Sequence, residues 1–352
     1  MQQRSINVGI RFGLRVPTQG RPQDTGAFAR QVEAAGFDFL WMPDTPLLAG
    51  RWRDVYVHLT CAALQTSRLR LGPGVTNPLT RHPIATASAI LSLDEASEGR
   101  ADLVAGTGYS SAYIIGRKAA TLATMQRTTH LWRSIFKGEK TQLGGLEINL
   151  MPPRPHVPIY LAATGPRMLQ LAGEIADGVL IMVGASAGTL AWALEQIETG
   201  MQRAGRQRHE VQRLVVVTAN VDADKARAID QMRPAAAGLY RHQHAATLLQ
   251  AAGLTLPTEF PDYPRPYPDL GHAVDWEAAK RAVSFVPDEA VEALVAVGSG
   301  AEVVERARAL MALDIDAIWW RDEASYTRPD ALLQALAQEV LPHLRDTARA
   351  PA

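Results

Sequence analysis

A short stretch at 71–83, LGPGVTNPLTRHP, carries the polar side chains that are best placed for chemistry. Its two glycines and three prolines impose an irregular backbone. The stretch follows an apolar alternating run and precedes a helical one, and rigid loops at strand ends are where α/β proteins build sites. A turn-rich connector is the alternative interpretation. The polar residues of the stretch are Thr76, Asn77, Thr80, Arg81 and His82.

Polar or glycine-rich clusters also follow other apolar runs of the chain. These clusters can form one functional site only if the fold brings them close together. The clusters are Asp44, Gly106-Thr107-Gly108-Tyr109, Ala163-Thr164-Gly165-Pro166 and Gly184.

Eight short apolar runs, each followed by a helical segment, make up the chain. The expected strands are 6–17, 37–42, 69–75, 101–105, 158–162, 177–183, 213–221 and 315–320. The expected helices are 25–35, 55–65, 84–96, 122–136, 167–176, 189–204, 224–250, 299–313 and 332–344.

Strict alternation predicts an α/β fold with a parallel sheet, and eight units predict a (β/α)8 TIM-like barrel with insertions. An open doubly wound sheet is the competitor, but no G-x-G-x-x-G follows the first strand. In a barrel the loops after the strands converge, so the polar clusters would share one mouth. Trp319 and Trp320 should face opposite sides of the eighth strand.

We expect one domain over 1–352, with insertions at about 137–157 and 253–275. The first insertion contains GLEINL, which is typical of a small hairpin. The second contains PDYPRPYPD, whose prolines exclude a regular helix or a central strand. This irregular segment before the last strand is either a lid over the mouth or an interface loop.

Composition limits the possible partners. Lys+Arg and Asp+Glu both number 36, so no net field attracts nucleic acid or an anionic membrane. The single cysteine, Cys61, excludes an internal disulfide, and neither a spanning apolar stretch nor a signal peptide is evident. His242 and His244 are two residues apart and do not share a helical face, so no metal site is expected. We therefore expect a cytoplasmic protein.

Several segments together resemble the luciferase-like family of flavin- and F420-dependent oxidoreductases. The main one is LGPGVTNPLTRHPIATASAILSLDEASEGRADLVAGTG, supported by FGLRVP, AAGFDFLWMPD, LAATGPRMLQLAGEIADGVLI and SFVPDEAVEAL. Within the family, the chain is most similar to the coenzyme F420-dependent branch that includes methylenetetrahydromethanopterin reductase. The resemblance spans roughly 12–320. Its motifs are specific to the family but not to one substrate.

This resemblance implies a barrel that binds F420, or FMN, at the mouth. It also implies a non-proline cis peptide after the third strand, which here would be Gly74–Val75, as a bulge behind the central ring of the cofactor. Thr76 and Asn77 would hydrogen-bond the polar edge of the ring. Asp44 stands where the family places an acidic residue after the second strand.

Further cofactor-binding positions follow the fourth, fifth and sixth strands. After the fourth, glycines would let the backbone approach the ring or its ribityl chain. After the fifth, a helix begins whose free N–H groups suit a phosphate or the ribityl oxygens. The positions are Gly106, Thr107, Gly108, Ala163, Thr164, Gly165, Pro166 and Gly184, with Arg167 adding charge.

Three positions depart from the methanopterin reductase pattern. Arg15 replaces a glutamate, Tyr109 an aspartate and Thr164 a glutamine, which argues against the pterin substrate and makes Arg15 the candidate substrate residue. Thr45 replaces the histidine that the luciferase-type and glucose-6-phosphate dehydrogenase patterns place after the second-strand aspartate. Tyr109 is then the titratable side chain beside the ring, where it could orient or protonate the substrate.

The candidates have structural alternatives. Asp44 could cap a helix or a turn, and Asn77 could close an Asx-turn before Pro78; for both we favour a role in the site. For Arg81 and His82 we favour the alternative, which is a solvated loop or a cap on the next helix.

We expect an oxidoreductase that transfers a hydride to or from a small organic substrate, with F420, or alternatively FMN, supplying the redox chemistry. Asp44 and Tyr109 are the expected catalytic residues, and a homodimer is the expected assembly. FMN with oxygen would instead give a monooxygenase. A hypothesis of another class is a catalytically silent barrel that carries a cofactor or ligand.

Overall fold

Eight parallel strands form the centre of the computed structural model, which describes residues 9–148, 156–257, 259, 262, 266–322 and 326–345. All eight overlap the predicted runs. They are β1 (Arg11–Arg15), β2 (Phe39–Met42), β3 (Arg70–Pro73), β4 (Leu103–Ala105), β7 (Ile159–Ala163), β8 (Gly178–Ile181), β9 (Gln212–Val221) and β11 (Ala317–Arg321).

The strands close into a ring. Parallel ladders join them in the order β3-β2-β1-β11-β9-β8-β7-β4. Two isolated parallel bridges, Leu71 with Ala101 and Thr76 with Ala105, then join β3 to β4. Since the first strand pairs with the last, the open doubly wound sheet is excluded and the barrel prediction is confirmed.

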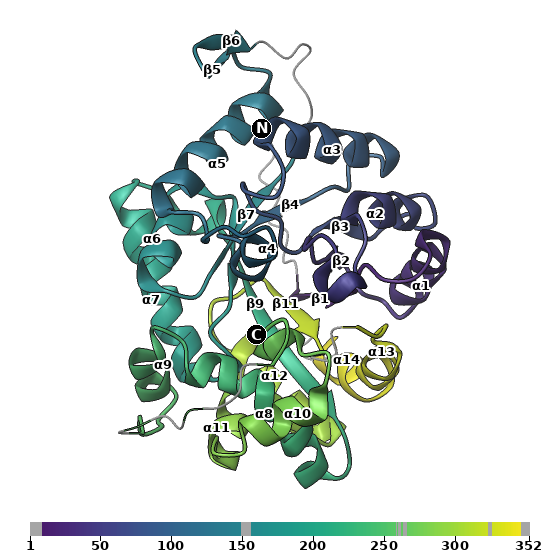
Figure 1. Ribbon diagram of the computed structural model, residues 1–352, viewed down its shortest axis with the longest axis vertical. Helices are drawn as coiled ribbons and strands as arrows, with labels where there is room; N and C mark the ends of the chain where they lie inside the picture. The colour runs from purple at the N-terminus through teal and green to yellow at the C-terminus, as the bar shows by residue number, and fades with distance from the viewer. Residues whose placement is uncertain are drawn as a thin grey trace.

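Helices surround the barrel (Figure 1). Where a helix begins is set locally, because the side chains of Asp54, Thr121 and Ser299 accept N–H hydrogen bonds in the first turns of three of them. The surrounding helices are α1 (Pro22–Ala34), α2 (Val55–Ala63), α3 (Pro83–Ala96), α5 (Leu122–Lys137), α6 (Pro166–Ile175), α7 (Ala187–Arg203), α8 (Lys225–Tyr240), α12 (Gly300–Met311), α13 (Asp330–Ala335) and α14 (Leu341–Arg345), the last two joined by η4 (Leu336–Val340).

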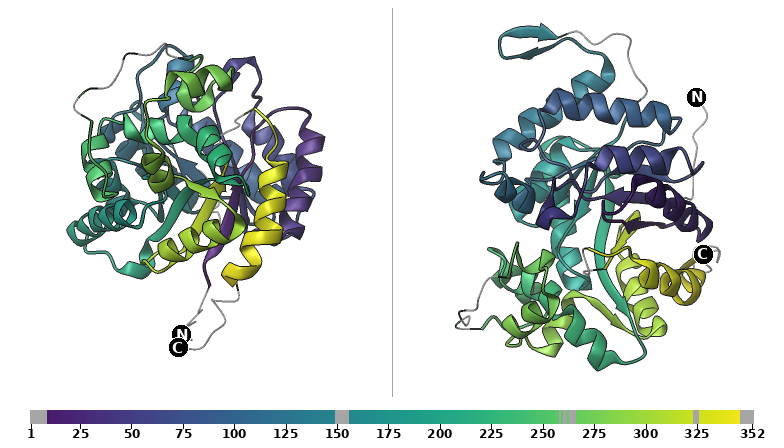
Figure 2. Two further views of the ribbon diagram at one scale, coloured as in Figure 1. Left: turned by 90° about the horizontal axis from the view of Figure 1, so that it is seen from below. Right: turned by 45° about the vertical axis from the view of Figure 1, so that its right-hand side comes forward.

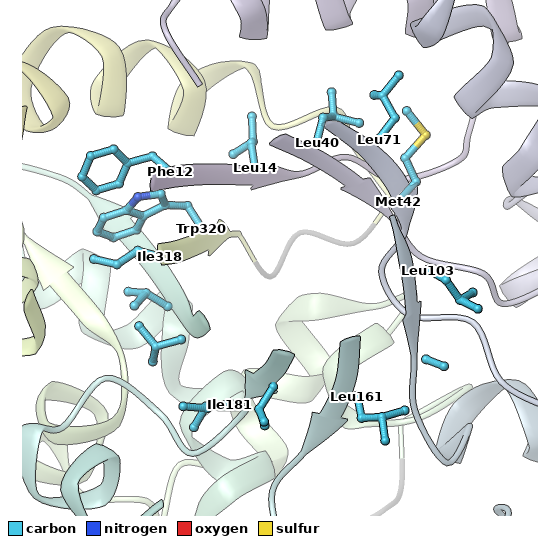
Figure 3. Packing of buried hydrophobic residues seen from close by; sticks show 14 of the residues in the cluster. Phe12, Leu14, Leu40, Met42, Leu71, Leu103, Leu161, Ile181, Ile318 and Trp320 are labelled. Carbon is cyan, nitrogen blue, oxygen red and sulfur yellow. The ribbon is translucent and has the colours of Figure 1, made fainter. Parts of the chain in front are cut away.

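Strand side chains alternate between two cores, as the pleat requires. One set fills the barrel interior, and the other packs between strands and helices. Trp319 belongs to the interior and Trp320 to the outer core, as predicted. Figure 3 shows outer-core side chains that point away from the strand ring, among them Phe12, Leu14, Leu40, Leu71, Leu161 and Ile181.

Three elements differ from the prediction. Strand β10 (Ala296–Gly298) pairs with β9 where no strand was predicted, because three residues are too few to show a strand period. Helix α4 (Tyr109–Ile114) begins where a loop was expected, since glycines precede it. The helix predicted over 224–250 is divided into α8 and α9 (Ala245–Ala251).

The two insertions lie on different sides of the barrel. Strands β5 (Thr141–Leu143) and β6 (Leu146–Ile148) form the expected hairpin, which projects away from the body (Figure 2). The second insertion contains the short turn η3 (Leu270–His272), and α10 (Trp276–Ala282) and α11 (Asp288–Leu294) follow it. Helices α8, α9 and α11 share a separate core. Parts of both predicted insertions, 149–155 and most of 258–265, lie outside the described residues.

Among the described residues, no helix is long and apolar enough to cross a membrane.

Candidate active site

The site begins at the seam between β3 and β4. The Thr76 N–H donates to the Val104 carbonyl at 2.9 Å, and the Gly106 N–H donates to the Thr76 carbonyl at 2.8 Å. The peptide bond Gly74–Val75 just before this point is cis, as the resemblance implied. The Val75 side chain is half-buried and packs against the interior core, so it forms part of the floor of the mouth.

Small residues line this floor, and their close packing excludes larger side chains. A Cβ at Gly106 would lie 3.2 Å from Cγ2 of Val75 and 3.5 Å from Cβ of Ala162, so the seam between β4 and β7 has no room for a larger side chain without displacing its neighbours. Half-buried residues at the adjoining strand ends are Thr107, Thr164, Gly165 and Met182. The floor is therefore built from small, mainly apolar residues, with hydroxyl groups at its edge.

Asp44 lies behind the seam and is only 2% exposed. Its Oδ2 accepts a hydrogen bond from Oγ1 of Thr76 at 2.7 Å and lies 3.9 Å from Nε of Arg81. Burial raises the pKa of the Asp44 carboxyl, and the Thr76 hydrogen bond and the Arg81 charge only partly offset that effect. This carboxyl consequently holds a proton to higher pH than an exposed aspartate does.

Arg81 is part of this network, so the prediction of a solvated loop or cap is wrong for it. Its guanidinium pairs with Asp54 and lies 4.9 Å from the ring centroid of Tyr56. The Tyr56 hydroxyl is buried beside Asp44, finds no hydrogen-bond partner among the described residues, and has a pKa raised by burial. His82 is the predicted cap: its Nδ1 accepts the N–H of Ile84 at 3.3 Å.

Asn77 holds the loop after β3 together. Its Oδ1 accepts the N–H groups of Leu79 at 2.9 Å and Thr80 at 3.0 Å, which is the Asx-turn alternative. Its amide donates to the hydroxyls of Thr80 and Ser111, at 3.0 and 2.9 Å. Gly108, at φ +79°, passes so close that a Cβ there would lie 2.8 Å from Asn77. The structure thus links the β3 and β4 loops, while contact of Asn77 with a cofactor stays a prediction.

The first strands of the barrel are covered by a group that we call the cap cluster, formed by Leu48, Trp52 and Tyr326. Arg15, the last residue of β1, lies behind it, with its guanidinium 5.4 Å from the centroid of the Trp52 ring. Arg15 is 6% exposed. It is at the strand end as predicted, and it lies beside Trp52 with little exposed surface.

Three side chains that the sequence did not single out meet beside the cap cluster. Nδ1 of His272 lies 2.8 Å from Oδ1 of Asp269, and Oγ of Ser110 donates to Oδ2 of Asp269 at 2.8 Å. Burial raises the pKa of Asp269, but the hydrogen bonds from His272 and Ser110 outweigh it and hold that pKa below its ordinary value. The only sequence signal was the spacing of three between Asp269 and His272.

Tyr109 is the first residue of α4, and its side chain is 80% exposed. The next two residues of the helix make hydrogen bonds instead: Ser110 donates to Asp269, and Ser111 accepts from Asn77. The structure therefore places Tyr109 at the rim of the mouth rather than on the floor, and its catalytic role stays a prediction.

The β7 and β8 ends complete the mouth. The Ala163 carbonyl accepts the Met182 N–H at 2.9 Å, and Gly165 is the N-cap of α6, without a side-chain capping bond and with Pro166 next. A Cβ at Gly165 would lie 2.4 Å from Nε2 of His244, so that imidazole covers one side of the helix start. Gly184 packs against Leu294 and thus faces α11 rather than the seam.

These features fit a planar ring with an anionic tail. The small apolar residues at Val75 and Gly106 leave room for a fused ring to lie close to the backbone, and the uncapped N–H groups at the start of α6 suit a phosphate. Within the described residues, no group of three or more His, Cys, Asp or Glu side chains is arranged to hold a metal ion.

Comparison with known proteins gives matches over most of the chain. The family model described as luciferase-like monooxygenase matches residues 3–317. A 5,10-methylenetetrahydromethanopterin reductase of Methanolobus tindarius is 38% identical over 224 residues, covering 62% of this chain and 67% of that protein. An F420-dependent glucose-6-phosphate dehydrogenase of Kineococcus radiotolerans is 30% identical over 236 residues, covering 61% and 69%.

One solved structure has the same fold over nearly its full length. It is the coenzyme F420-dependent tetrahydromethanopterin reductase from Methanopyrus kandleri, with a TM-score of 0.76 and 23% identity, covering 96% of this chain and 99% of that one.

Proposed function

The chain belongs to the luciferase-like monooxygenase family, and from that premise we propose that it is an oxidoreductase that transfers a hydride between coenzyme F420 and a small organic substrate. Relatives named as F420-dependent favour F420 over FMN. The observation that carries the proposal is the floor of the mouth, where Val75 and Gly106 provide a small-residue, apolar surface and α6 begins without a side-chain cap.

When bound, the deazaflavin would supply the site that accepts or donates the hydride. The chain would hold it in place: Val75 and Gly106 would lie behind the ring, Thr107 and Thr164 would lie at its edge, and the N–H groups around Gly165 would bind the phosphate of its tail. Positioning of this kind is the main contribution of a protein whose cofactor carries the redox chemistry.

Asp44 and Thr76 would act as the polar support behind the ring. Thr76 is fully buried and gives its hydroxyl hydrogen to Asp44, so this pair would support the loop after β3 from behind. The raised pKa of Asp44 keeps a proton available to the site at higher pH than an ordinary carboxyl would. Tyr109 is the second candidate proton donor; unchanged turnover in Tyr109→Phe would remove it.

The test is direct binding. Titration of the purified protein with F420 should quench or shift the cofactor fluorescence with a defined Kd, and FMN should bind far more weakly. Gly106→Val should weaken F420 binding at least 10-fold, because its side chain occupies the floor next to Val75. Gly238→Val is the matched control, since Gly238 is an exposed residue of α8 with no atoms close to its Cβ position.

Tight FMN binding without F420 binding would replace the proposal with a flavin enzyme of the monooxygenase type. Binding of F420 without turnover of any substrate would favour the silent carrier. Binding of neither cofactor would refute the proposal.

Three further expectations belong to the same proposal. We propose that the chain works as one domain, in the cytoplasm, and as a homodimer. Light scattering after size-exclusion chromatography tests the last of these, because a mass of one chain at working concentration contradicts it.

A further inference from the structure

A histidine outside every sequence motif stands at the mouth of the barrel. His272 lies in the short turn η3, and three other segments meet around it. Its ring meets the Trp52 ring edge-on, at 5.6 Å and 88°. Its carbonyl accepts the Tyr326 hydroxyl at 2.7 Å. Through Asp269 it is joined to Ser110 of α4, the helix after β4. This convergence places His272 beside the substrate end of the site.

The imidazole is oriented by a carboxylate. Nδ1 lies 2.8 Å from Oδ1 of Asp269, and Ser110 donates to the other oxygen at 2.8 Å. With both of its oxygens engaged, Asp269 is fixed in position. An ionised carboxylate at Nδ1 keeps the hydrogen there and leaves the Nε2 lone pair for another partner. The pairing therefore prepares Nε2 to take up a proton.

Nε2 remains available. No hydrogen bond to it occurs within the described residues, and the His272 side chain is 24% exposed, so a small molecule can reach it. The charged or titratable groups around His272 come from several segments. They are Asp269 and Tyr267 on its own segment, Tyr326, Arg51 over the Tyr326 ring, and Arg15 beside the Trp52 ring. A histidine–aspartate pair on an open surface would be a minor ion pair, but this pair is largely enclosed by neighbouring segments.

Resting on the function proposed above, we propose that His272, oriented by Asp269 and Ser110, is the general base and acid for an alcohol/carbonyl substrate pair. In oxidation, the C–H bond of the alcohol breaks and its electron pair leaves as hydride to the oxidised deazaflavin. The O–H bond breaks, its proton forms a bond to Nε2, and its electrons complete the C=O bond. In reduction, the imidazolium returns that proton to the oxygen as hydride arrives at carbon.

The kinetic test uses F420 with a panel of named alcohols, 2-propanol, 1-phenylethanol and glucose 6-phosphate, followed by F420 absorbance. His272→Gln should lower kcat about 100-fold or more, the usual size of a general acid–base contribution, and leave the Kd for F420 unchanged. His130→Gln is the matched control, since His130 is an exposed residue of α5. Equal kcat in both variants, or no turnover of any alcohol, would overturn the inference.

The pH profile separates catalysis from a structural role. The acidic limb of kcat for alcohol oxidation should disappear in His272→Gln. In Asp269→Asn it should move to lower pH, because the carboxylate no longer stabilises the imidazolium. An unmoved limb in Asp269→Asn refutes the pairing.

A measurement without turnover keeps the two proposals apart. Diethyl pyrocarbonate should modify Nε2 of His272, and bound F420 should slow this modification while leaving that of His130 unchanged. Binding of F420 with no protection of His272 would overturn the inference and leave the proposed function standing. Absence of F420 binding would instead overturn the proposed function, together with the inference that rests on it.

Discussion

Gly108 is a position where one added methyl group should damage the site. Its φ of +79° lies in the left-handed region, and a Cβ there would come within 2.8 Å of both Cβ and Cγ of Asn77. Asn77 cannot simply move, because its side chain makes hydrogen bonds to Leu79, Thr80 and Ser111. Gly108→Ala therefore forces an alanine into the left-handed conformation and also displaces Asn77.

The two costs can be added. A left-handed conformation costs an L-residue about 1–2 kcal/mol. Displacing Asn77 breaks part of its hydrogen-bond set, at about 1 kcal/mol for each bond lost. We expect Gly108→Ala to lower the free energy of unfolding by about 3 kcal/mol. We also expect weaker F420 binding, because Asn77 links the loops that follow β3 and β4.

Gly116→Ala is the matched control. Gly116 follows the same helix at φ +69°, and no atom lies within 4 Å of its Cβ position. This variant should carry only the backbone cost of about 1–2 kcal/mol and should bind F420 normally. Urea unfolding followed by circular dichroism measures both. If the two variants lose equal stability, the role assigned to Asn77 is wrong.

Two further predictions concern buried carboxylates. The folded-state pKa of Asp44 is raised, so its favourable contribution to stability is present at acid pH and is lost as pH rises through that pKa. The difference in unfolding free energy between wild type and Asp44→Asn, measured by urea unfolding, should therefore favour the wild type most at low pH, and a difference that does not vary with pH would contradict this. Asp102 is 1% exposed and accepts hydrogen bonds from Arg70 at 2.6 Å and from Trp41 at 3.1 Å, so Asp102→Ala should lower the unfolding free energy by about 3–5 kcal/mol. Asp24→Ala, which removes an exposed ion pair, should lower it little, and equal losses would refute the role of burial.

The barrel was predictable because its signal is local. Each strand is a short apolar run bounded by turn residues, and each run is followed by a helical period, so eight units can be counted along the chain. β10 was missed since its three residues share one run, VAVGSG, with the end of a helix and the start of another. α4 was missed because its six residues follow three positions rich in glycine.

The site was predictable only where it consists of backbone. The loops after β3, β4 and β7 carry glycine, proline and threonine in patterns that a resemblance can locate, and the cis bond at Gly74–Val75 followed from that resemblance. Other contacts depend on how the loops at the strand ends meet above the barrel. Examples are the pairing of Arg81 with Asp54 and that of Ser110 with Asp269, 159 positions apart. No sequence period encodes such contacts.

The two halves of the mouth explain why the family is easier to identify than the substrate. The half at β3, β4 and β7 is built from small residues and backbone groups, such as Gly106 and the start of α6, so its shape follows from the chain path. The half at β1 and β11 is built from large side chains contributed by separate loops, among them Trp52 and His272. On the proposed function, the cofactor ring would need only the first half. Substrate choice would then depend on the second, where an exchange at Arg15 changes the charge next to Trp52.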